Sequence, residues 1–279
     1  MNVHALTMGQ ISNWFKPRPK NANKGDFGHV LVIGGDYGMP GAVRIAAEAA
    51  ARTGAGLVTV ITRPEHVAST VSMRPEILCY GVDDISLFSE LVDRATVIVL
   101  GPGLGHSDWS KQFIEPVLNC KQPLLVDADG LNLLASMGLA QSARENWILT
   151  PHPGEAARLL GLTVNEIQSD RPRACLALRK RYGGVIVLKG QHTLVAAKDS
   201  LLVYCPAGNP GMASAGMGDL LSGMIAGLLA QGLTLAHAAQ AGVMLHATAG
   251  DRAAQQHSQI GLLASDLLLE LPALLNELV

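Results

Sequence analysis

A glycine-rich stretch that ends in a carboxylate is the part of this sequence best suited to chemistry. Residues 209–219 read Asn-Pro-Gly-Met-Ala-Ser-Ala-Gly-Met-Gly-Asp and run into the apolar segment 220–229, which predicts a helix. Small residues let a ligand approach the backbone, and the first amides of a helix point outward with a dipole that favours anions. The sequence therefore predicts an anion cradle that includes the backbone of Gly216 and Gly218.

Asp219 places a negative group at the mouth of this cradle, where it repels a bound phosphate. Such a carboxylate is useful in a site that removes a proton from a hydroxyl beside a phosphate, so we predict that Asp219 is a general base. The alternative is a flexible loop followed by an ordinary acidic helix start. Because a simple cap needs only one Asp and one Gly, we favour the catalytic interpretation for Asp219, Gly216 and Gly218.

The elements that must position these residues alternate along the chain. Apolar runs predict strands over residues 29–33, 57–62, 96–100, 124–126, 147–150 and 184–188, and a helix is predicted over 42–52. Thr163 and Glu166 match a helix capping box. Strands that alternate with helices indicate an α/β fold with a mostly parallel central sheet and helices on both faces. We predict a peripheral N-terminal arm over residues 1–25 and a single domain over 26–279.

Glycines and polar residues follow these strands directly. They are Gly34-Gly35, Gly101–Gly105, Asp127–Gly130, His152–Glu155 and Lys189-Gly190. Ligands of open parallel sheets bind outside the carboxyl ends of the strands. The five strand ends therefore predict one shared cleft, although Gly101–Gly105 by itself is equally consistent with a tight turn.

Three of these strand ends suggest particular contacts. Lys189, with Gly190, Gln191, His192 and Thr193 after it, has groups that suit the phosphate, ribose or base of a nucleotide, although a Lys at a strand end is more often solvated. His152 and Glu155 lie in a loop stiffened by two prolines, which makes a functional role as plausible as a packed or exposed histidine. Glu155 and Asp219 are spaced so that they could hold Mg²⁺ through water. Asp127 and Asp129 are either ligands or helix N-caps. We favour capping for Asp129 and leave Asp127 open.

Composition excludes several other classes of protein. The formal charge is −2 and Lys and Arg form no cluster larger than residues 179–181, so a nucleic-acid partner is not expected. The four scattered cysteines suggest buried thiols in a cytoplasmic protein, and no signal peptide is apparent. Residues 220–250 carry no charge, but Gln231-Gly232 divides them into two helices, each too short to span a membrane.

The motifs, taken in order, resemble those of the NAD(P)HX dehydratase family within the ribokinase-like superfamily. The resemblance covers roughly residues 20–275 and is highly specific as an ordered set. Its signatures are residues 24–35, Gly41-Ala42, residues 54–59, Gly101–Gly105, residues 127–132, residues 150–155, Lys189-Gly190, residues 209–211 and residues 215–219. Met217 departs from the family, because many relatives carry Thr there.

The resemblance implies repair of a hydrated nicotinamide dinucleotide (NADHX or NADPHX), with phosphorylation of the ring hydroxyl by ADP and expulsion of phosphate. Ala42, Gly105, His152 and Asp219 would then contact this substrate, whereas Lys189 to Thr193 and Gly218 would contact ADP or ATP. The resemblance also implies Mg²⁺ as cofactor, a homo-oligomer such as a tetramer, and an NAD(P)HX epimerase as functional partner. Because no epimerase domain is apparent, we expect the chain alone to act on one epimer.

Two other interpretations remain open at this point. One is a vitamin-precursor kinase of the same superfamily, of the hydroxymethylpyrimidine or hydroxyethylthiazole type, which would stop at the phosphorylated alcohol. Its relatives resemble one another in an Asn-containing version of the loop 151–155. The other is a nucleotide-binding module without catalysis, which would gain nothing from the carboxylate of Asp219.

Overall fold

A ten-stranded sheet forms the centre of the computed structural model, which describes residues 3–138, 143–198 and 200–279. Its strand order is β1-β10-β9-β8-β7-β6-β5-β2-β3-β4. Antiparallel pairing occurs at β8–β9 and β9–β10, and all other neighbours are parallel. The strands are β1 (His4–Ala5), β2 (His29–Ile33), β3 (Leu57–Thr62), β4 (Leu78–Gly81), β5 (Val97–Leu100), β6 (Leu124–Val126), β7 (Trp147–Leu149), β8 (Val185–Leu188), β9 (Leu194–Ala196) and β10 (Val203–Tyr204).

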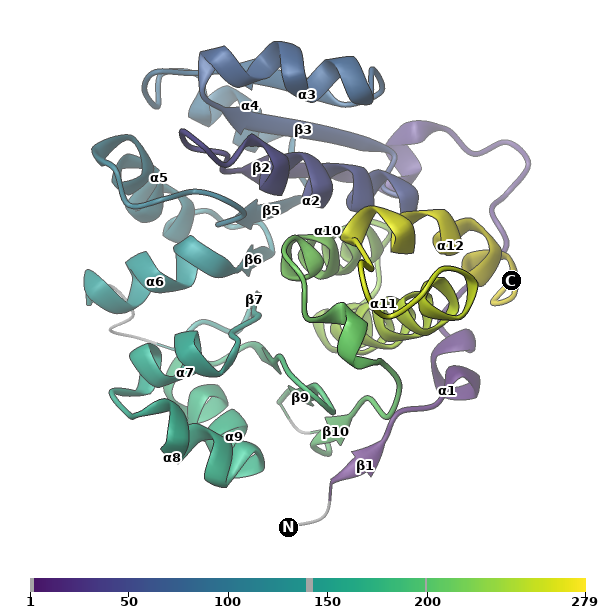
Figure 1. Cartoon of the computed structure of the whole chain (residues 1–279). Coiled ribbons are helices and arrows are strands. Elements are labelled where there is room, and N and C mark those ends of the chain that lie inside the picture. Colours follow the sequence, from purple (N-terminus) through teal and green to yellow (C-terminus); the bar gives the residue numbers. More distant parts are fainter. Residues whose placement is uncertain (1–2, 139–142, 199) are drawn as a thin grey trace.

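Helices cover both faces of this sheet (Figure 1). They are α1 (Met8–Ser12), α2 (Pro40–Arg52), α3 (Val67–Met73), α4 (Phe88–Arg94), α5 (Asp108–Leu118), α6 (Ala128–Ser136), α7 (Pro153–Leu160), α8 (Val164–Ser169), α9 (Arg171–Tyr182), α10 (Met217–Ala230), α11 (Leu235–Gln256) and α12 (Ala264–Asn276). Helices α2, α10, α11 and α12 pack on one face, whereas α4, α5, α6, α7 and α9 pack on the other. The predicted fold is therefore confirmed.

Continuous apolar runs place the central strands where the sequence predicts them. Strands β2, β3 and β6 have the predicted bounds, and every residue of β2 is buried because helices cover both of its sides. Thr163 forms the predicted capping box with Glu166 at the start of α8. The uncharged segment 220–250 divides into α10 and α11 around Gln231-Gly232. Within the described residues, no helix is both long and apolar enough to cross a bilayer.

Part of the predicted N-terminal arm is built into the domain. Strand β1 pairs with β10 at the sheet edge, and the side chains of Leu6 and Ile11 are buried in the core. Only the segment after α1 runs over the outside (Figure 1), where the Arg18 guanidinium donates a hydrogen bond to the Gly54 carbonyl at 2.6 Å. The first half of the arm is therefore not peripheral, because the buried side chains of Leu6 and Ile11 tie it to the core.

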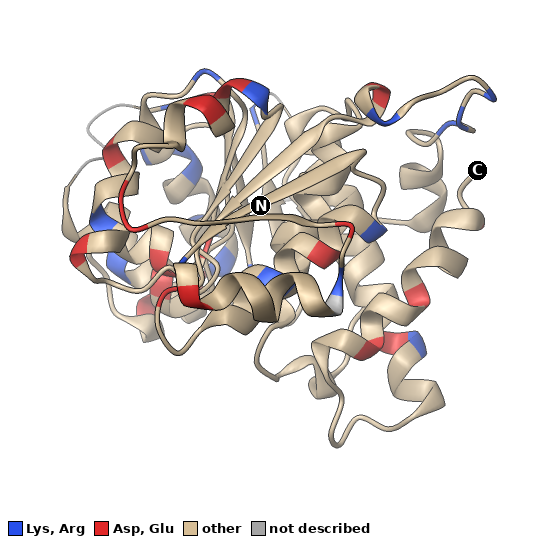
Figure 2. Cartoon of the chain, turned by 90° about the horizontal axis from the view of Figure 1, so that it is seen from above, with Lys and Arg blue, Asp and Glu red and all other residues tan. Residues whose placement is uncertain are grey.

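Two of the four cysteines differ from the prediction made from composition, whereas the charges are mixed as expected. Figure 2 shows basic and acidic segments intermixed over the chain, without an extended basic stripe. Cys175 and Cys205 are buried as predicted. Cys79 and Cys120 are only partly buried, because one lies in β4 next to the sheet edge and the other follows the end of α5.

Candidate active site

The start of α10 has the geometry of an anion cradle. Gly216 occupies the N-cap position in the left-handed conformation (φ 85°), which a residue with a side chain rarely adopts. Among the described residues no side chain caps the helix, so the first amides of α10 face outward. A Cβ added to Gly218 would lie 3.2 Å from Lys189 Nζ, so a larger residue at this position would crowd the lysine ammonium.

Asp219 lies in the first turn of α10, and its side chain is partly buried. No hydrogen bond joins this side chain to any of the described residues. Burial and the negative charge of Asp127 raise the pKa of Asp219 to about 7, against the opposing charge of Lys189. A partly buried carboxylate that titrates near neutrality and has no hydrogen bond within the described residues is suited to accept a proton from a ligand.

Lys189 extends from the end of β8 into a group of carboxylates. Its ammonium Nζ lies 2.6 Å from Asp127 Oδ1 and 3.8 Å from Glu155 Oε2. Burial alone would lower the pKa of Lys189, but the charges of Asp127 and Glu155 outweigh it and raise the pKa. The lysine is therefore charged and held beside Asp219, which also contributes to its raised pKa.

Asp127, which the sequence left open, proves central to this group. It is 1% exposed and accepts a second hydrogen bond from Ser222 Oγ on α10 at 2.7 Å. The prediction that Asp129 caps α6 is wrong. Asp127 occupies the N-cap position of that helix, and Asp129 Oδ2 instead accepts a hydrogen bond from the amide of Gly105 at 2.8 Å.

His152 and Glu155 bond to one another at the start of α7. His152 Nδ1 accepts hydrogen bonds from the amides of Gly154 and Glu155, and Glu155 Oε2 accepts one from the amide of His152 at 2.7 Å. Burial lowers the pKa of His152, with a further contribution from Lys189, so the imidazole is neutral at pH 7. Burial raises the pKa of Glu155, Lys189 opposes this shift and Asp127 adds to it, and the resulting pKa is about 7. Among the described residues, no three His, Cys, Asp or Glu side chains form a group suited to a metal ion.

The segment after Lys189 presents an open loop. Gly190 and His192 both have positive φ (136° and 54°), and the side chains of Gln191 and His192 are exposed. Arg171 lies beneath the loop and donates hydrogen bonds to the carbonyls of Leu188 and Lys189 at 3.2 Å and to that of Gln191. Arg171 therefore holds the backbone of the loop in place, while the exposed side chains of Gln191 and His192 are accessible to a ligand.

The loops after β2 and β5 bring the remaining predicted residues to the same edge of the sheet. A Cβ on Gly103 would lie 3.0 Å from that of Ala42, and a Cβ on Gly105 would lie 3.0 Å from Asp36 Oδ2. The amide of Gly105 donates a hydrogen bond to Asp129, whose charge also contributes to the raised pKa of Asp219. The strand ends predicted to share a cleft therefore do meet along one edge.

Comparison with known proteins agrees with this geometry. A family model described as NAD(P)H-hydrate dehydratase matches residues 30–273. The chain belongs to this family. It is 57% identical over 259 residues to a bifunctional NAD(P)H-hydrate repair enzyme from Coxiella burnetii, covering 93% of this chain and 52% of that one. The chain thus spans about half the length of the bifunctional relatives.

Two further family members match over most of their own length. An ADP-dependent (S)-NAD(P)H-hydrate dehydratase from Neisseria meningitidis is 38% identical over 244 residues, which is 85% of this chain and 81% of that one. The crystal structure of an ADP/ATP-dependent NAD(P)H-hydrate dehydratase from Bacillus subtilis, co-crystallised with ATP and Mg²⁺, superposes with a TM-score of 0.88 at 30% identity and covers 100% of both chains.

Some residues around the candidate site of this chain were not predicted from sequence. Asp127 pairs with Lys189 and accepts a hydrogen bond from Ser222, Arg171 supports the loop after Lys189, and Asp36 pairs with Arg63. The position of Asp127 and Asp36 directly after strands was the available signal. Ser222 and Arg171 lie within helices, where nothing in the local sequence distinguishes them from ordinary surface residues.

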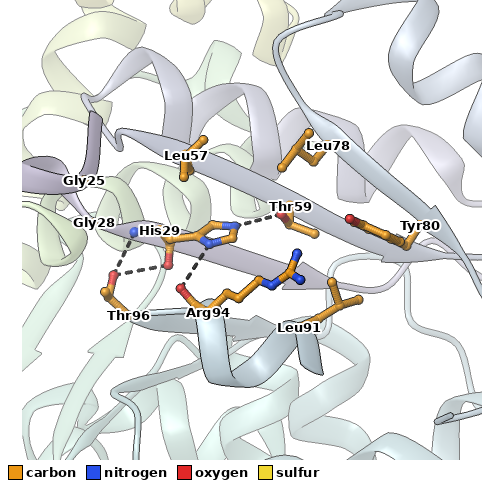
Figure 3. Close-up of a pocket in the computed structure, with 10 residues that line it drawn as sticks. All are labelled: Gly25, Gly28, His29, Leu57, Thr59, Leu78, Tyr80, Leu91, Arg94 and Thr96. Atoms are coloured by element: carbon orange, nitrogen blue, oxygen red, sulfur yellow. Dashed lines mark hydrogen bonds between the residues drawn. The ribbon is translucent and has the colours of Figure 1, made fainter. Parts of the chain in front are cut away.

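A hollow of about 430 Å³ lies at the opposite, amino ends of the strands (Figure 3). His29 Nε2 lies 2.7 Å from the Thr59 hydroxyl, and His29 Nδ1 lies 3.1 Å from the Arg94 carbonyl. Because both of its ring nitrogens already have protein partners, His29 has no nitrogen left to act on a ligand.

Proposed function

We propose that this chain dehydrates NADHX or NADPHX and regenerates NADH or NADPH, while ADP is converted to AMP and phosphate. The observation that carries this proposal is the partly buried carboxylate of Asp219, which has a pKa of about 7 and no hydrogen bond to the described residues. It lies beside the charged Lys189 and the uncapped start of α10. A base, a cation and outward amides are the parts that phosphoryl transfer to a hydroxyl requires.

In the first step Asp219 accepts the proton of the ring hydroxyl. The hydroxyl oxygen forms a bond to the β-phosphorus of ADP, the bond from that phosphorus to the bridging oxygen breaks, and AMP leaves. Lys189 and the amides of residues 216–218 stabilise the charge on the transferring group. In the second step the ring C–O bond breaks, phosphate leaves with the electron pair, and the ring loses a proton as its double bond re-forms.

The substrate and the nucleotide would occupy neighbouring parts of one cleft. Ala42, Gly105, His152 and Asp219 would contact the hydrated dinucleotide. Gly218 and the loop from Lys189 to Thr193 would contact ADP. The contacts among Gly103, Ala42, Gly105 and Asp36 on one side, and the open loop supported by Arg171 on the other, support this division.

A magnesium ion is part of the proposal only in a limited form. Direct coordination by Glu155 does not fit, because Glu155 Oε2 accepts the amide hydrogen of His152 at 2.7 Å and lies 3.8 Å from Lys189 Nζ. A contact through water remains the prediction, since Mg²⁺ keeps several waters beside phosphate oxygens. No step of the reaction is assigned to the ion.

A single assay tests the proposed function against the kinase alternative. The chain is mixed with hydrated NADH and ADP or ATP, and the near-ultraviolet absorbance of NADH is followed. Return of this absorbance with release of phosphate supports dehydration. Accumulation of a phosphorylated hydrate without NADH would instead identify a kinase that stops at the phosphorylated alcohol, and no reaction at all would leave only a binding module.

We also propose that the chain acts as a homo-oligomer, a tetramer as in the prediction from sequence, in the cytoplasm and beside an NAD(P)HX epimerase. Exposed apolar side chains around α12, such as Ile260, Leu263 and Leu269, support an interface between copies. The name of the Coxiella burnetii relative, a bifunctional repair enzyme, supports the link to a second activity.

A further inference from the structure

An exposed aromatic ring follows β2, close to the loops that carry the predicted substrate contacts. Tyr37 is 58% exposed, yet its side chain is fixed at several points. Its hydroxyl donates a hydrogen bond to Glu65 Oε1 at 3.0 Å, and its ring meets that of His66 edge-on at 6.0 Å. Its amide donates to Asp36 Oδ1 at 2.9 Å. A large apolar ring is thus held in place while much of it faces solvent.

The ring is backed by a second fixed group. The Arg63 guanidinium lies 4.4 Å from the centre of the Tyr37 ring and 4.7 Å from that of Trp109. Arg63 Nε pairs with Asp36 Oδ1 at 2.7 Å, and Ser107 Oγ donates to Asp36 Oδ2 at 2.6 Å. Burial would raise the pKa of Asp36, but the hydrogen bonds from Ser107 and Arg63 lower it, so the pair is ionised. The support under Tyr37 is therefore neutral as a whole and rigid.

This platform lies at a definite distance from the reacting groups. In the sheet, β5 separates β6, which ends at Asp127, from β2, which leads to Tyr37. Neighbouring strands are about 4.8 Å apart, which places β2 about 10 Å and β3 about 14 Å from β6. Gly105 lies between the two regions, because its amide bonds to Asp129 and its Cβ position adjoins Asp36.

We propose that Tyr37 is the stacking platform for the distal base, the adenine, of the hydrated dinucleotide. This inference rests on the proposed function and adds a subsite to it. With the reacting ring at Asp219, two riboses and a diphosphate must be spanned before the second base. The start of α2 follows Tyr37 in the chain, no side chain of the described residues caps it, and it suits the diphosphate. The adenine of ADP belongs on the other side, with the loop after β8.

The chemistry of the platform favours a planar base over an aliphatic group. The Tyr37 ring offers a face on which any base can stack, and the cation–π contact with Arg63 helps to hold the ring in one orientation. Stacking of one base on one aromatic side chain changes affinity about 5- to 150-fold. Because Glu65, Arg63 and Asp36 already fix the ring, little conformational entropy is lost when the base binds.

The test compares a full dinucleotide with its reacting half. Tyr37→Ala and Tyr37→Phe are assayed with ADP and either hydrated NADH or hydrated reduced nicotinamide mononucleotide, which lacks the adenosine half. Tyr80→Ala, a tyrosine that lines the hollow at the amino ends of the strands, is the control. Thermal unfolding of each variant shows whether the fold is kept, and equilibrium titration with NADH measures binding without turnover.

We expect Tyr37→Ala to raise KM for hydrated NADH, and the Kd for NADH, about 5- to 150-fold, with kcat unchanged. KM for the mononucleotide and for ADP should stay the same, and Tyr37→Phe should resemble the parent because it keeps the ring. Equal effects of Tyr37→Ala on KM for both substrates, or no effect on either, would overturn the assignment of Tyr37 as the stacking platform. The parent chain would still be active in that case. A parent chain with no turnover would instead overturn the proposed function, so the two failures are distinguishable.

Discussion

The two ends of the parallel strands differ in how their polar groups are satisfied. At the amino ends, a hollow contains His29, and both of its ring nitrogens have protein partners. At the carboxyl ends, Asp219 has no hydrogen bond within the described chain, and three carboxylates gather around Lys189. We therefore take an unsatisfied, electrostatically perturbed group, rather than a hollow, as the indicator of the candidate site.

This perturbation has a cost in stability that depends on pH. The pKa of Asp219 rises from 3.8 to about 7, and that of Glu155 rises from 4.5 to about 7. Between pH 4 and 7 these two groups bind more protons in the folded chain than in the unfolded chain, so their contribution to stability falls as pH rises through this window. The amino-end hollow contains no carboxylate with such a shift, since its lining residues are apolar, hydroxyl-bearing or basic.

Gly218→Val should give the largest effect, a loss of all measurable turnover in a folded protein. A Cβ at this position lies 3.2 Å from Lys189 Nζ and 3.7 Å from Asp127 Oδ2, so a branched side chain displaces the ion pair and fills the cradle. Circular dichroism and thermal melting check the fold, and calorimetric titration checks ADP binding. A variant that binds ADP normally would show that the anion cradle lies elsewhere.

Asp219→Asn should retain ADP binding but lose about 10²–10⁴-fold in kcat, because the amide cannot accept the hydroxyl proton. In the parent, kcat/KM should rise with pH through about 7 as Asp219 ionises. Because Asn carries no charge, the free energy of unfolding of the variant at pH 8 should exceed that of the parent by at most about 4 kcal/mol, so the variant should melt at a higher temperature. Near pH 4 the two proteins should melt at the same temperature. Parental turnover in the variant would make Asp219 a structural residue.

The sequence predicts the strands and the meeting of their ends more readily than the pairing of charges. Apolar runs of four to six residues fix β2 and β3, and parallel strands bring their carboxyl ends to one edge whatever the loops contain. The choice between Asp127 and Asp129 depends on the backbone turn at Ala128, whose φ of 46° no pattern in the sequence indicates.

Short edge strands and partners distant in sequence were equally beyond prediction. Strands β1 and β10 contain two residues each, so they have no periodicity, and they form because they can pair with a sheet that already exists. Ser222 Oγ reaches Asp127 across 95 positions of the chain. The residues that support Tyr37 likewise come from three loops, which only the folded chain places together.

Lys189→Ala should have an intermediate effect, and the structure changes what we expect from it. From sequence, this lysine contacts only the adenine nucleotide, so ADP binding should weaken and dinucleotide binding should stay nearly constant. Its pairing with Asp127 adds a structural cost, because an unpaired buried carboxylate destabilises a protein by about 3–5 kcal/mol. Titration with each ligand and thermal melting separate the two effects.

The matched control for Lys189→Ala is the double variant with Asp127→Asn, which removes the unpaired charge. The double variant should regain stability but not ADP affinity. If both ligands bound equally weakly to a double variant of restored stability, Lys189 would support a wall shared by the two subsites.

His29→Phe at the amino ends should have the smallest effect on activity and a measurable effect on stability. The substitution keeps the ring but removes the hydrogen bonds to Thr59 and to the Arg94 carbonyl, each worth about 0.5–1.5 kcal/mol. Unfolding in urea should therefore show a loss of about 1–3 kcal/mol, while kcat and both KM values stay at parental levels. Thr59→Val removes one of the two bonds and should cost about half as much. A fall in kcat in His29→Phe, at a stability like that of Thr59→Val, would mean that the hollow at the amino ends takes part in function, and that satisfied polar groups do not separate the two ends of this sheet.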